Sequence, residues 1–131
     1  MQLPKVSIII INYNGKHHLE SCLESLLKIN YDNIEIIVVD NNSTDDSVSF
    51  ISTNFPDLIL IKLNENKGFA EPNNLGAKIA KGDFLLLLNN DILDNMVDLN
   101  KVNVLNSLTL LIIILSSYLH KHLKYKGIKS H

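Results

Sequence analysis

The sequence predicts an α/β fold in which a mostly parallel, doubly wound sheet is flanked by helices. Four apolar runs of strand length alternate along the chain with segments of helical periodicity, which is the order of elements in such a fold. The apolar runs are rich in isoleucine, valine and leucine and show little polar alternation, as expected for strands covered on both faces. A short polar cluster follows each run, where the chain would leave the sheet.

The first part of the chain is expected to form two strands joined by a helix. KVSIIII at residues 5–11 predicts the first strand, and NYNG at residues 12–15 predicts a turn. A helix is expected from about residue 16 to residue 29, and IEIIVVD at residues 34–40 predicts the second strand. The inner face of the first helix is predicted to hold residues that recur at helical spacing, namely Leu19, Cys22, Leu23 and Leu26.

Ser43 is expected to be the N-cap at the start of the second helix, which is expected to end before Pro56. Asp45 and Asp46 would then lie in its first turn, where the helix dipole favours anions. LILIKL at residues 58–63 predicts the third strand. The inner face of the second helix is predicted to hold Val48, Ile51 and Phe55.

A long polar loop at residues 64–74 follows the third strand. The third helix is expected from about Pro72, with Gly82 as its stop. DFLLLL at residues 83–88 predicts the fourth strand. The inner face of the third helix is predicted to hold Leu75 and Ile79.

The pattern changes after residue 95, which divides the chain into a sheet-forming part at 1–95 and a C-terminal extension at 96–131. The first part holds 13 acidic residues and 7 lysines, so we expect no binding of nucleic acid through its phosphates. The extension holds one acidic residue and 5 lysines. Its very apolar segment at 108–119 has three interpretations: a buried strand or helix, an interfacial or membrane segment, and a non-native tail. An exposed apolar face there would also favour self-association into a homo-oligomer.

The compartment is predicted from the cysteine content and the N-terminus. Cys22 is the single cysteine, which fits a reducing compartment. The first residues lack the pattern of a secretory signal. We therefore expect a cytoplasmic protein that could lie peripherally at the inner membrane face through its basic C-terminal segment.

Parallel strands place their carboxyl ends at one edge of a sheet, and ligands of open α/β sheets bind beyond that edge. Each of the four predicted strands ends in a polar cluster, so the fold would bring four clusters together. These clusters are Asn12-Tyr13-Asn14, Asp40-Asn41-Asn42-Ser43, Asn64-Glu65-Asn66 and Asn89-Asn90-Asp91.

Such an edge has the groups that a nucleoside diphosphate needs: a flat wall for the base, polar groups for the ribose, and positive charge for the phosphates. Tyr13 could form the wall, and Asp40 could accept a hydrogen bond from the base or the ribose. Asp91 could hold Mg²⁺ or Mn²⁺, which prefer oxygen ligands. Each residue has a plain alternative: Tyr13 as a packing residue, Asp40 as a cap of its turn, and Asp91 as a turn residue. Lys67 could meet phosphate or be solvated.

Two other kinds of ligand site are disfavoured by spacing. A dinucleotide-binding fold needs G-x-G-x-x-G after the first strand, whereas NYNGKHHL has one glycine. The pairs His17-His18 and His120-x-His122 lack the accompanying ligands of a zinc site and are expected to be exposed.

Three stretches, VSIIIINYNG, IEIIVVDNNSTDDS and NENKGFAEPNNLGAKIAKGDFLLLLNND, together resemble the N-terminal, donor-binding half of family 2 glycosyltransferases. The resemblance covers about residues 5–95. Within the family, the three stretches are most similar to the rhamnosyltransferase-like members. It implies the GT-A fold, a Rossmann-like and mostly parallel sheet, truncated in this chain after the strand that carries the family's D-x-D motif. It also implies a nucleotide-diphosphate sugar as donor and a divalent cation, Mg²⁺ or Mn²⁺, as cofactor.

By this resemblance, Asp91 would bind the metal that bridges the diphosphate, with Asn89 in place of the first Asp of D-x-D. Asp40 would contact the base, and Glu71 and Pro72 stand where relatives commonly have small residues. No catalytic residue is identified, because the general base and the acceptor site belong to the family's second half. The nucleotide-sugar-binding residues that the resemblance implies are Asn12, Tyr13, Asn14, Asp40, Asn42, Ser43, Gly68, Phe69, Asn73, Asn74, Asn89 and Asn90.

Three functions stay open at this point. The first is an enzyme that transfers a sugar from a UDP- or dTDP-sugar to a glycan or glycolipid acceptor. The second is a non-catalytic module that binds a nucleotide sugar. The third is an interaction protein that self-associates or attaches to a membrane through residues 97–119.

Overall fold

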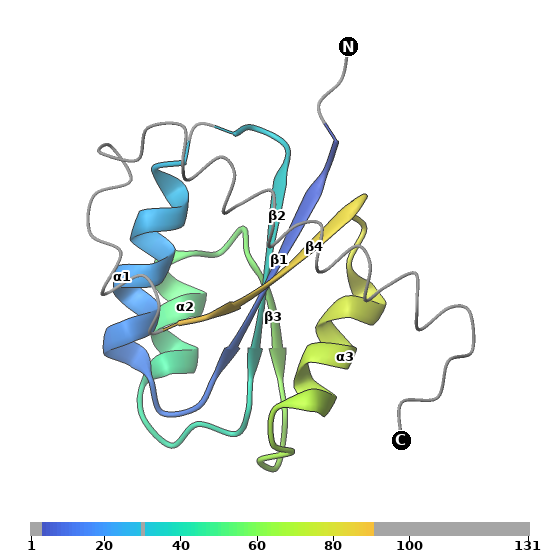
Figure 1. The fold of residues 1–131 in the computed structure, drawn as a ribbon. Helices are drawn as coiled ribbons and strands as arrows, with labels where there is room; N and C mark the ends of the chain where they lie inside the picture. The colour runs from blue at the N-terminus through green and yellow to red at the C-terminus, as the bar shows by residue number, and fades with distance from the viewer. Residues whose placement is uncertain (1–3, 30, 91–131) are drawn as a thin grey trace, which may run out of the picture.

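The computed structural model describes residues 4–29 and 31–90, which form a parallel sheet with helices on both faces (Figure 1). The predicted C-terminal extension and the predicted metal ligand Asp91 lie outside these residues. The elements in chain order are β1 (Val6–Asn12), α1 (Lys16–Leu27), β2 (Ile34–Asp40), α2 (Ser47–Asn54), β3 (Ile59–Lys62), α3 (Ala70–Ile79) and β4 (Phe84–Asn89).

The sheet has the order β3-β2-β1-β4, and every neighbouring pair is parallel. In the register, Val6 of β1 lies beside Ile34 of β2 on one side and Phe84 of β4 on the other. Helices α1 and α2 cover one face, and α3 covers the opposite face (Figure 1). This arrangement confirms the predicted α/β class and places the carboxyl ends of all four strands at one edge.

The uninterrupted apolar character of β1 follows from its central position. Ile8 and Ile10 pack toward α1 and α2, whereas Ile9 packs in the smaller core layer beneath α3. All three are at most 2% exposed, and burying such a side chain contributes roughly 1.5–3 kcal/mol. A strand with helices on both sides therefore has no position for polar alternation, which is why the sequence pattern predicted it.

The predicted start of α2 at Ser43 is wrong. The helix begins at Ser47, because the Ser43 hydroxyl donates to Asp40 within the turn that follows β2. Asp45 and Asp46 therefore precede the helix, and Asp45 Oδ1 accepts the Ser47 backbone N–H at 3.0 Å. On the predicted inner face, Ile51 is buried, while Val48 and Phe55 are half-buried.

The predicted inner face of α3 is partly wrong. Leu75 is half-buried, and Ile79 is 41% exposed instead of facing the core. The helix begins at Ala70, and its buried side is formed by Pro72, Asn73 and Gly76. Gly76 packs directly on Ile9, so α3 approaches the sheet through a residue without a side chain rather than through its large apolar ones.

Gly82 is not the helix stop that the sequence predicted, since α3 ends at Ile79 and Ala80 is already extended. Gly82 instead permits a close approach between the segment before β4 and the start of β1. A Cβ atom on Gly82 would lie 2.6 Å from the backbone nitrogen of Ser7, and the Gly82 N–H donates to Ser7 Oγ at 2.8 Å. Within the described part of the chain, no helix is long and apolar enough to cross a membrane.

Glu35 joins three segments at the amino edge of the sheet, opposite the predicted site. Its carboxylate accepts hydrogen bonds from the Ser7 hydroxyl and from the Lys81 N–H at 2.5 Å, and Lys5 Nζ lies 3.5 Å away. Burial alone would raise the pKa of the Glu35 carboxyl. The hydrogen bonds from Ser7 and Lys81 and the charge of Lys5 outweigh burial and hold this pKa below its usual value.

Replacing Glu35 with glutamine is expected to lower the free energy of unfolding at pH 7 by about 1 kcal/mol. A carboxyl with a lowered folded pKa stabilises above its unfolded pKa of about 4.3, and the gain is lost as the pH falls through the folded value. Urea denaturation of both proteins from pH 7 to pH 3 should therefore show a difference that disappears in acid. A difference that stayed constant across this range would contradict the assigned interaction.

Candidate functional site

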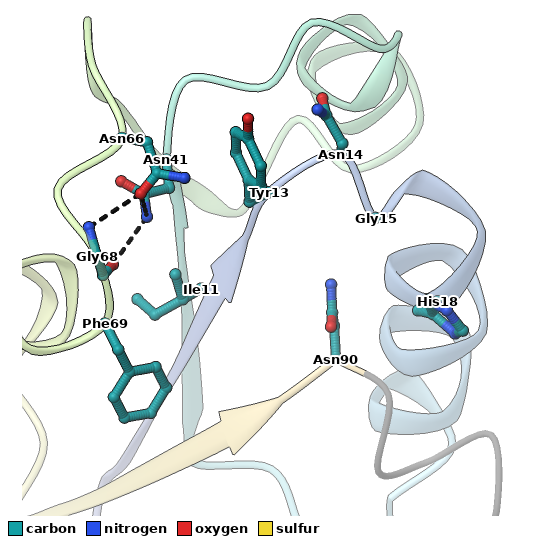
Figure 2. A pocket seen from close by; sticks show the side chains of 10 residues that line it. All are labelled: Ile11, Tyr13, Asn14, Gly15, His18, Asn41, Asn66, Gly68, Phe69 and Asn90. Carbon is teal, nitrogen blue, oxygen red and sulfur yellow. Dashed lines mark hydrogen bonds between the residues drawn. The ribbon is translucent and has the colours of Figure 1, made fainter.

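The loops that follow the four strands form an open pocket of about 490 Å³ at the carboxyl edge of the sheet (Figure 2). The predicted polar clusters therefore do meet at one edge. The pocket is lined by Ile11, Tyr13, Asn14, Gly15, His18, Asn41, Asn66, Gly68, Phe69 and Asn90.

Asn12 is fully buried and connects the ends of three strands by hydrogen bonds. Its Nδ2 donates to Asp40 Oδ1 at 3.0 Å and to Ser43 Oγ at 3.2 Å. Its Oδ1 accepts from Asn90 Nδ2 at 3.1 Å. Asn12 was predicted as a nucleotide-binding residue, but it lies behind the pocket and supports the residues around it.

Asp40 is 1% exposed, and its carboxylate is used within its own turn. Oδ1 accepts from the Ser43 hydroxyl at 2.6 Å, and Oδ2 accepts from the Ser43 N–H at 2.9 Å. This is the capping role that the sequence left open for Asp40. Neither Asp40 nor Ser43 lines the pocket, and the contact between Asp40 and a base remains a prediction.

Asn14 joins the loop after β1 to the loop after β2. It adopts a left-handed backbone conformation with φ of 48°, which asparagine tolerates better than most residues. Its N–H donates to Ser43 Oγ at 2.9 Å, and its Oδ1 accepts the Thr44 N–H at 2.7 Å. Asn42 also has a positive φ, 66°, but it is exposed in the turn and does not line the pocket.

Asn41 fastens the loop after β3 to the end of β2, and it is 3% exposed. Its Nδ2 donates to Gly68 O at 2.8 Å and to Asn66 Oδ1 at 3.0 Å (Figure 2). Its Oδ1 accepts the Lys67 N–H at 2.8 Å. Gly68 has φ of 73° with open space around it, so a backbone requirement explains this glycine. The Asn41 side chain thus holds residues 66–68, the segment that forms one side of the pocket, against the end of β2.

Two aromatic rings and one aliphatic side chain give the pocket its apolar surface. Tyr13 is 52% exposed and Phe69 is 61% exposed, although both line the pocket, and Ile11 is half-buried beside them. Figure 2 shows Tyr13 and Phe69 on either side of Ile11. Exposed rings beside a set of amides form a surface on which a planar, polar ring can lie.

The charged groups near the pocket are paired with each other. Lys67 Nζ lies 3.1 Å from both Glu65 and Glu71, and these hydrogen-bonded carboxylates raise the pKa of Lys67. Lys16 Nζ lies 2.6 Å from Asp46, whose hydrogen bond raises the pKa of Lys16. Among the residues that the structure describes, no lysine lines the pocket.

Two helix N-termini lie at the pocket. Gly15 is the N-cap residue of α1 and Phe69 is that of α3, and both line the pocket. The start of a helix favours an anion, but the Lys16 N–H of α1 already donates to Asp45 Oδ2 at 3.2 Å, and Pro72 in the first turn of α3 has no N–H.

The remaining predicted site residues take several positions. Asn73 is buried and donates to Phe69 O at 2.9 Å, and Asn74 is exposed; neither lines the pocket. Asn89 ends β4, and Asn90 lines the pocket. Asp91 lies outside the described residues, within which no group of three histidine, cysteine or acidic residues could hold a metal ion.

Five pocket residues were not among the predicted site residues. Asn41 and Asn66 belong to the polar clusters that follow the strands, so position in the pattern could have identified them. Ile11 and Gly15 are apolar and carry no signal for a site. His18 is exposed, as predicted, and its place one turn into α1 brings it to the pocket.

Comparison with known proteins gives a consistent family. A model of glycosyl transferase family 2 matches residues 7–102. The Escherichia coli UDP-Glc:alpha-D-GlcNAc-diphosphoundecaprenol beta-1,3-glucosyltransferase WfaP is 44% identical over 87 residues, 66% of this chain and 35% of WfaP. Glycosyltransferase GlyG of Streptococcus pneumoniae is 34% identical over 98 residues, 71% of this chain and 33% of GlyG.

Solved structures agree with the sequence relatives. Residues 1–349 of Staphylococcus aureus TarS in complex with UDP match with a TM-score of 0.62 and 30% identity, over 66% of this chain and 27% of that chain. The mannosyltransferase PcManGT of Pyrobaculum calidifontis, in complex with GDP-Man and Mn²⁺, matches with a TM-score of 0.62 and 28% identity, over 67% of this chain and 28% of PcManGT.

The chain thus spans about a third of the length of the curated relatives. The described residues have the GT-A fold that the resemblance implied. The extent of the family match and the identities of the relatives lead to one conclusion: the chain belongs to glycosyl transferase family 2.

Proposed function

We propose that this chain forms the donor-binding part of a glycosyltransferase that moves a sugar from a UDP- or dTDP-sugar to a glycan or glycolipid acceptor. The observation that carries the proposal is the pocket at the carboxyl edge of the sheet, with exposed aromatic rings, oriented amides and two helix N-termini. The relatives support it, because the name of WfaP specifies a UDP-Glc donor and a lipid-linked acceptor, and TarS is seen with UDP. That these relatives are glycosyltransferases favours transfer over a non-catalytic binding module.

Different parts of the pocket suit the base, the ribose and the diphosphate of a nucleoside diphosphate. Tyr13 and Phe69 offer apolar surface to the base, and the amides offer hydrogen bonds to the base and the ribose. The diphosphate would lie near the helix N-termini. Because Lys16 and Lys67 are each paired with carboxylates, the described residues bring little net positive charge to balance it.

This shortage of positive charge supports a divalent cation as cofactor, Mg²⁺ or Mn²⁺. Asp91 follows Asn90 directly in the chain, and a carboxylate beside amide groups is the oxygen-rich donor set that these ions prefer. One carboxylate is sufficient where phosphate oxygens and water complete the coordination. The cation would neutralise charge on the diphosphate as the bond to the sugar breaks. PcManGT, which is seen with Mn²⁺, supports this choice.

Titration calorimetry of the 131-residue chain tests the proposal. UDP or dTDP is expected to bind in the presence of Mn²⁺, and removal of the metal with EDTA should weaken binding by about tenfold or more. Asp91→Ala should reproduce the loss, whereas Asp57→Ala, which removes an exposed carboxylate remote from the pocket, should not. Equal affinities for wild type and Asp91→Ala would refute the metal role, and absence of binding by both nucleotides would refute the donor site.

A further inference from the structure

We infer that Asn66 selects the base: its Nδ2 donates a hydrogen bond to a base carbonyl that stands where cytosine carries its amine. The inference rests on the proposed function, since it concerns the nucleotide that the pocket would hold. It depends on the orientation of two neighbouring amides, Asn41 and Asn66, both of which line the pocket.

The orientation of the Asn41 amide is fixed by the backbone. The Lys67 N–H is a donor and lies 2.8 Å from Asn41 Oδ1. On its other side, Asn41 Nδ2 faces an acceptor, Gly68 O, at 2.8 Å. Exchanging the oxygen and nitrogen of this amide would put two donors together and two acceptors together, so the observed orientation is required.

The orientation of Asn66 follows from that of Asn41. Asn66 Oδ1 accepts two hydrogen bonds, from the Gly68 N–H at 2.9 Å and from Asn41 Nδ2 at 3.0 Å. Both partners are donors, so the oxygen of Asn66 must face them. Within residues 4–29 and 31–90, Asn66 Nδ2 makes no hydrogen bond of its own. Figure 2 shows this nitrogen directed toward the side of the pocket where Tyr13 lies.

The pocket therefore presents a donor of fixed direction beside an exposed aromatic ring. A base lying against Tyr13 would meet Asn66 Nδ2 with its edge. Uracil and thymine carry a carbonyl oxygen at the ring position where cytosine carries an amine. The Asn66 amide can therefore donate to uracil or thymine, whereas with cytosine it would face another donor. A site that orients a hydrogen-bonding group discriminates strongly against an analogue that leaves this group without a partner.

Calorimetric affinities for UDP and CDP, both measured with Mn²⁺, test the inference. Wild type is expected to bind UDP about tenfold or more tightly than CDP, a difference of about 1.4 kcal/mol. Asn66→Asp keeps the oxygen that accepts from Gly68 and Asn41 and replaces the free donor with an acceptor. The UDP preference should fall by about tenfold or more. The added negative charge repels both diphosphates alike. The ratio of the UDP and CDP affinities therefore reports only the contact between residue 66 and the base.

Asn64→Asp is the charge-matched control. It adds the same charge two residues earlier in the loop, at an exposed residue that does not line the pocket, and it leaves the contacts of Asn41 and Asn66 in place. It should therefore weaken UDP and CDP by similar factors and leave the ratio of their affinities unchanged. If the wild-type protein binds CDP as tightly as UDP, the inference is wrong, and no variant is needed to show it. An unchanged ratio in Asn66→Asp also overturns it, while UDP binding by wild type leaves the proposed function intact. If wild type binds neither UDP nor CDP, both the inference on Asn66 and the proposed function are wrong.

Discussion

Replacing Asn12 with leucine is expected to lower the free energy of unfolding by about 3 kcal/mol, because the Asp40 carboxylate loses a buried hydrogen bond and Asn90 loses its acceptor. Leucine has a similar size and forms no hydrogen bonds, so the effect reports polar contacts rather than a cavity. UDP affinity should fall as well, since Asn12 joins the loops that shape the pocket. Urea denaturation and calorimetry measure the two effects.

Ser43→Ala is the control for this prediction. It removes the hydroxyl that contacts Asn12 and Asp40 but leaves the bond between Asn12 and Asn90 in place, so its effect should be smaller. If Asn12→Leu unfolded at the same urea concentration as wild type and bound UDP equally well, the supporting role assigned to Asn12 would be wrong.

Gly82→Ala is expected to lower the free energy of unfolding by about 2–3 kcal/mol. The added Cβ would meet backbone atoms, 2.6 Å from the Ser7 nitrogen and 2.9 Å from the Phe84 oxygen, so the starts of β1 and β4 would have to move apart. Because both contacts are with backbone, a change of side-chain rotamer cannot relieve them.

Lys81→Ala provides a neighbouring comparison. The Lys81 side chain is exposed, and the residue contacts Glu35 through its backbone N–H, which alanine retains. Its effect should stay within about 0.5 kcal/mol. Equal stability of Gly82→Ala and wild type in urea denaturation would show that the close approach is not required.

The strands were predictable from sequence because they are buried on both faces. IEIIVVD at 34–40 became β2 with the expected bounds, and the other three strands agree to within one residue at each end. Burial of a central parallel strand leaves a continuous apolar run, and the short length of each run and the polar cluster after it favour a strand over a buried helix.

The helix details were less predictable because tertiary contacts decided them. Ser43 has the side chain of a good cap, but the turn after β2 uses its hydroxyl, so the N-cap of α2 is Asp46, three residues later. On α3, hydrophobicity pointed to Ile79, whereas contact with the sheet is made at Gly76. Local propensity cannot reveal which residue permits the closest approach of two elements.

The position of the site was predictable, but the division of roles within it was not. Clusters at the strand ends identified the edge of the sheet, and Tyr13 and Phe69 do line the pocket. Asn12 and Asp40 were predicted to touch the ligand; both are buried and hydrogen-bonded within the loops, so these contacts stay a prediction, and Asn41, which was not predicted, lines the pocket. Neighbouring polar residues in one cluster cannot be distinguished by sequence. Whether each one lines the pocket or supports it from below depends on the direction of its side chain.

The central claim is that the pocket at the carboxyl edge binds the nucleotide of a sugar donor. The most direct test is an NMR titration of the isotope-labelled chain with UDP and Mg²⁺, which avoids paramagnetic broadening. We predict that the backbone amides of Tyr13, Asn41, Gly68 and Phe69 shift with one saturation curve, while that of Glu35 at the opposite edge does not. Saturable shifts confined to the opposite edge, or no shifts at all, would contradict the claim.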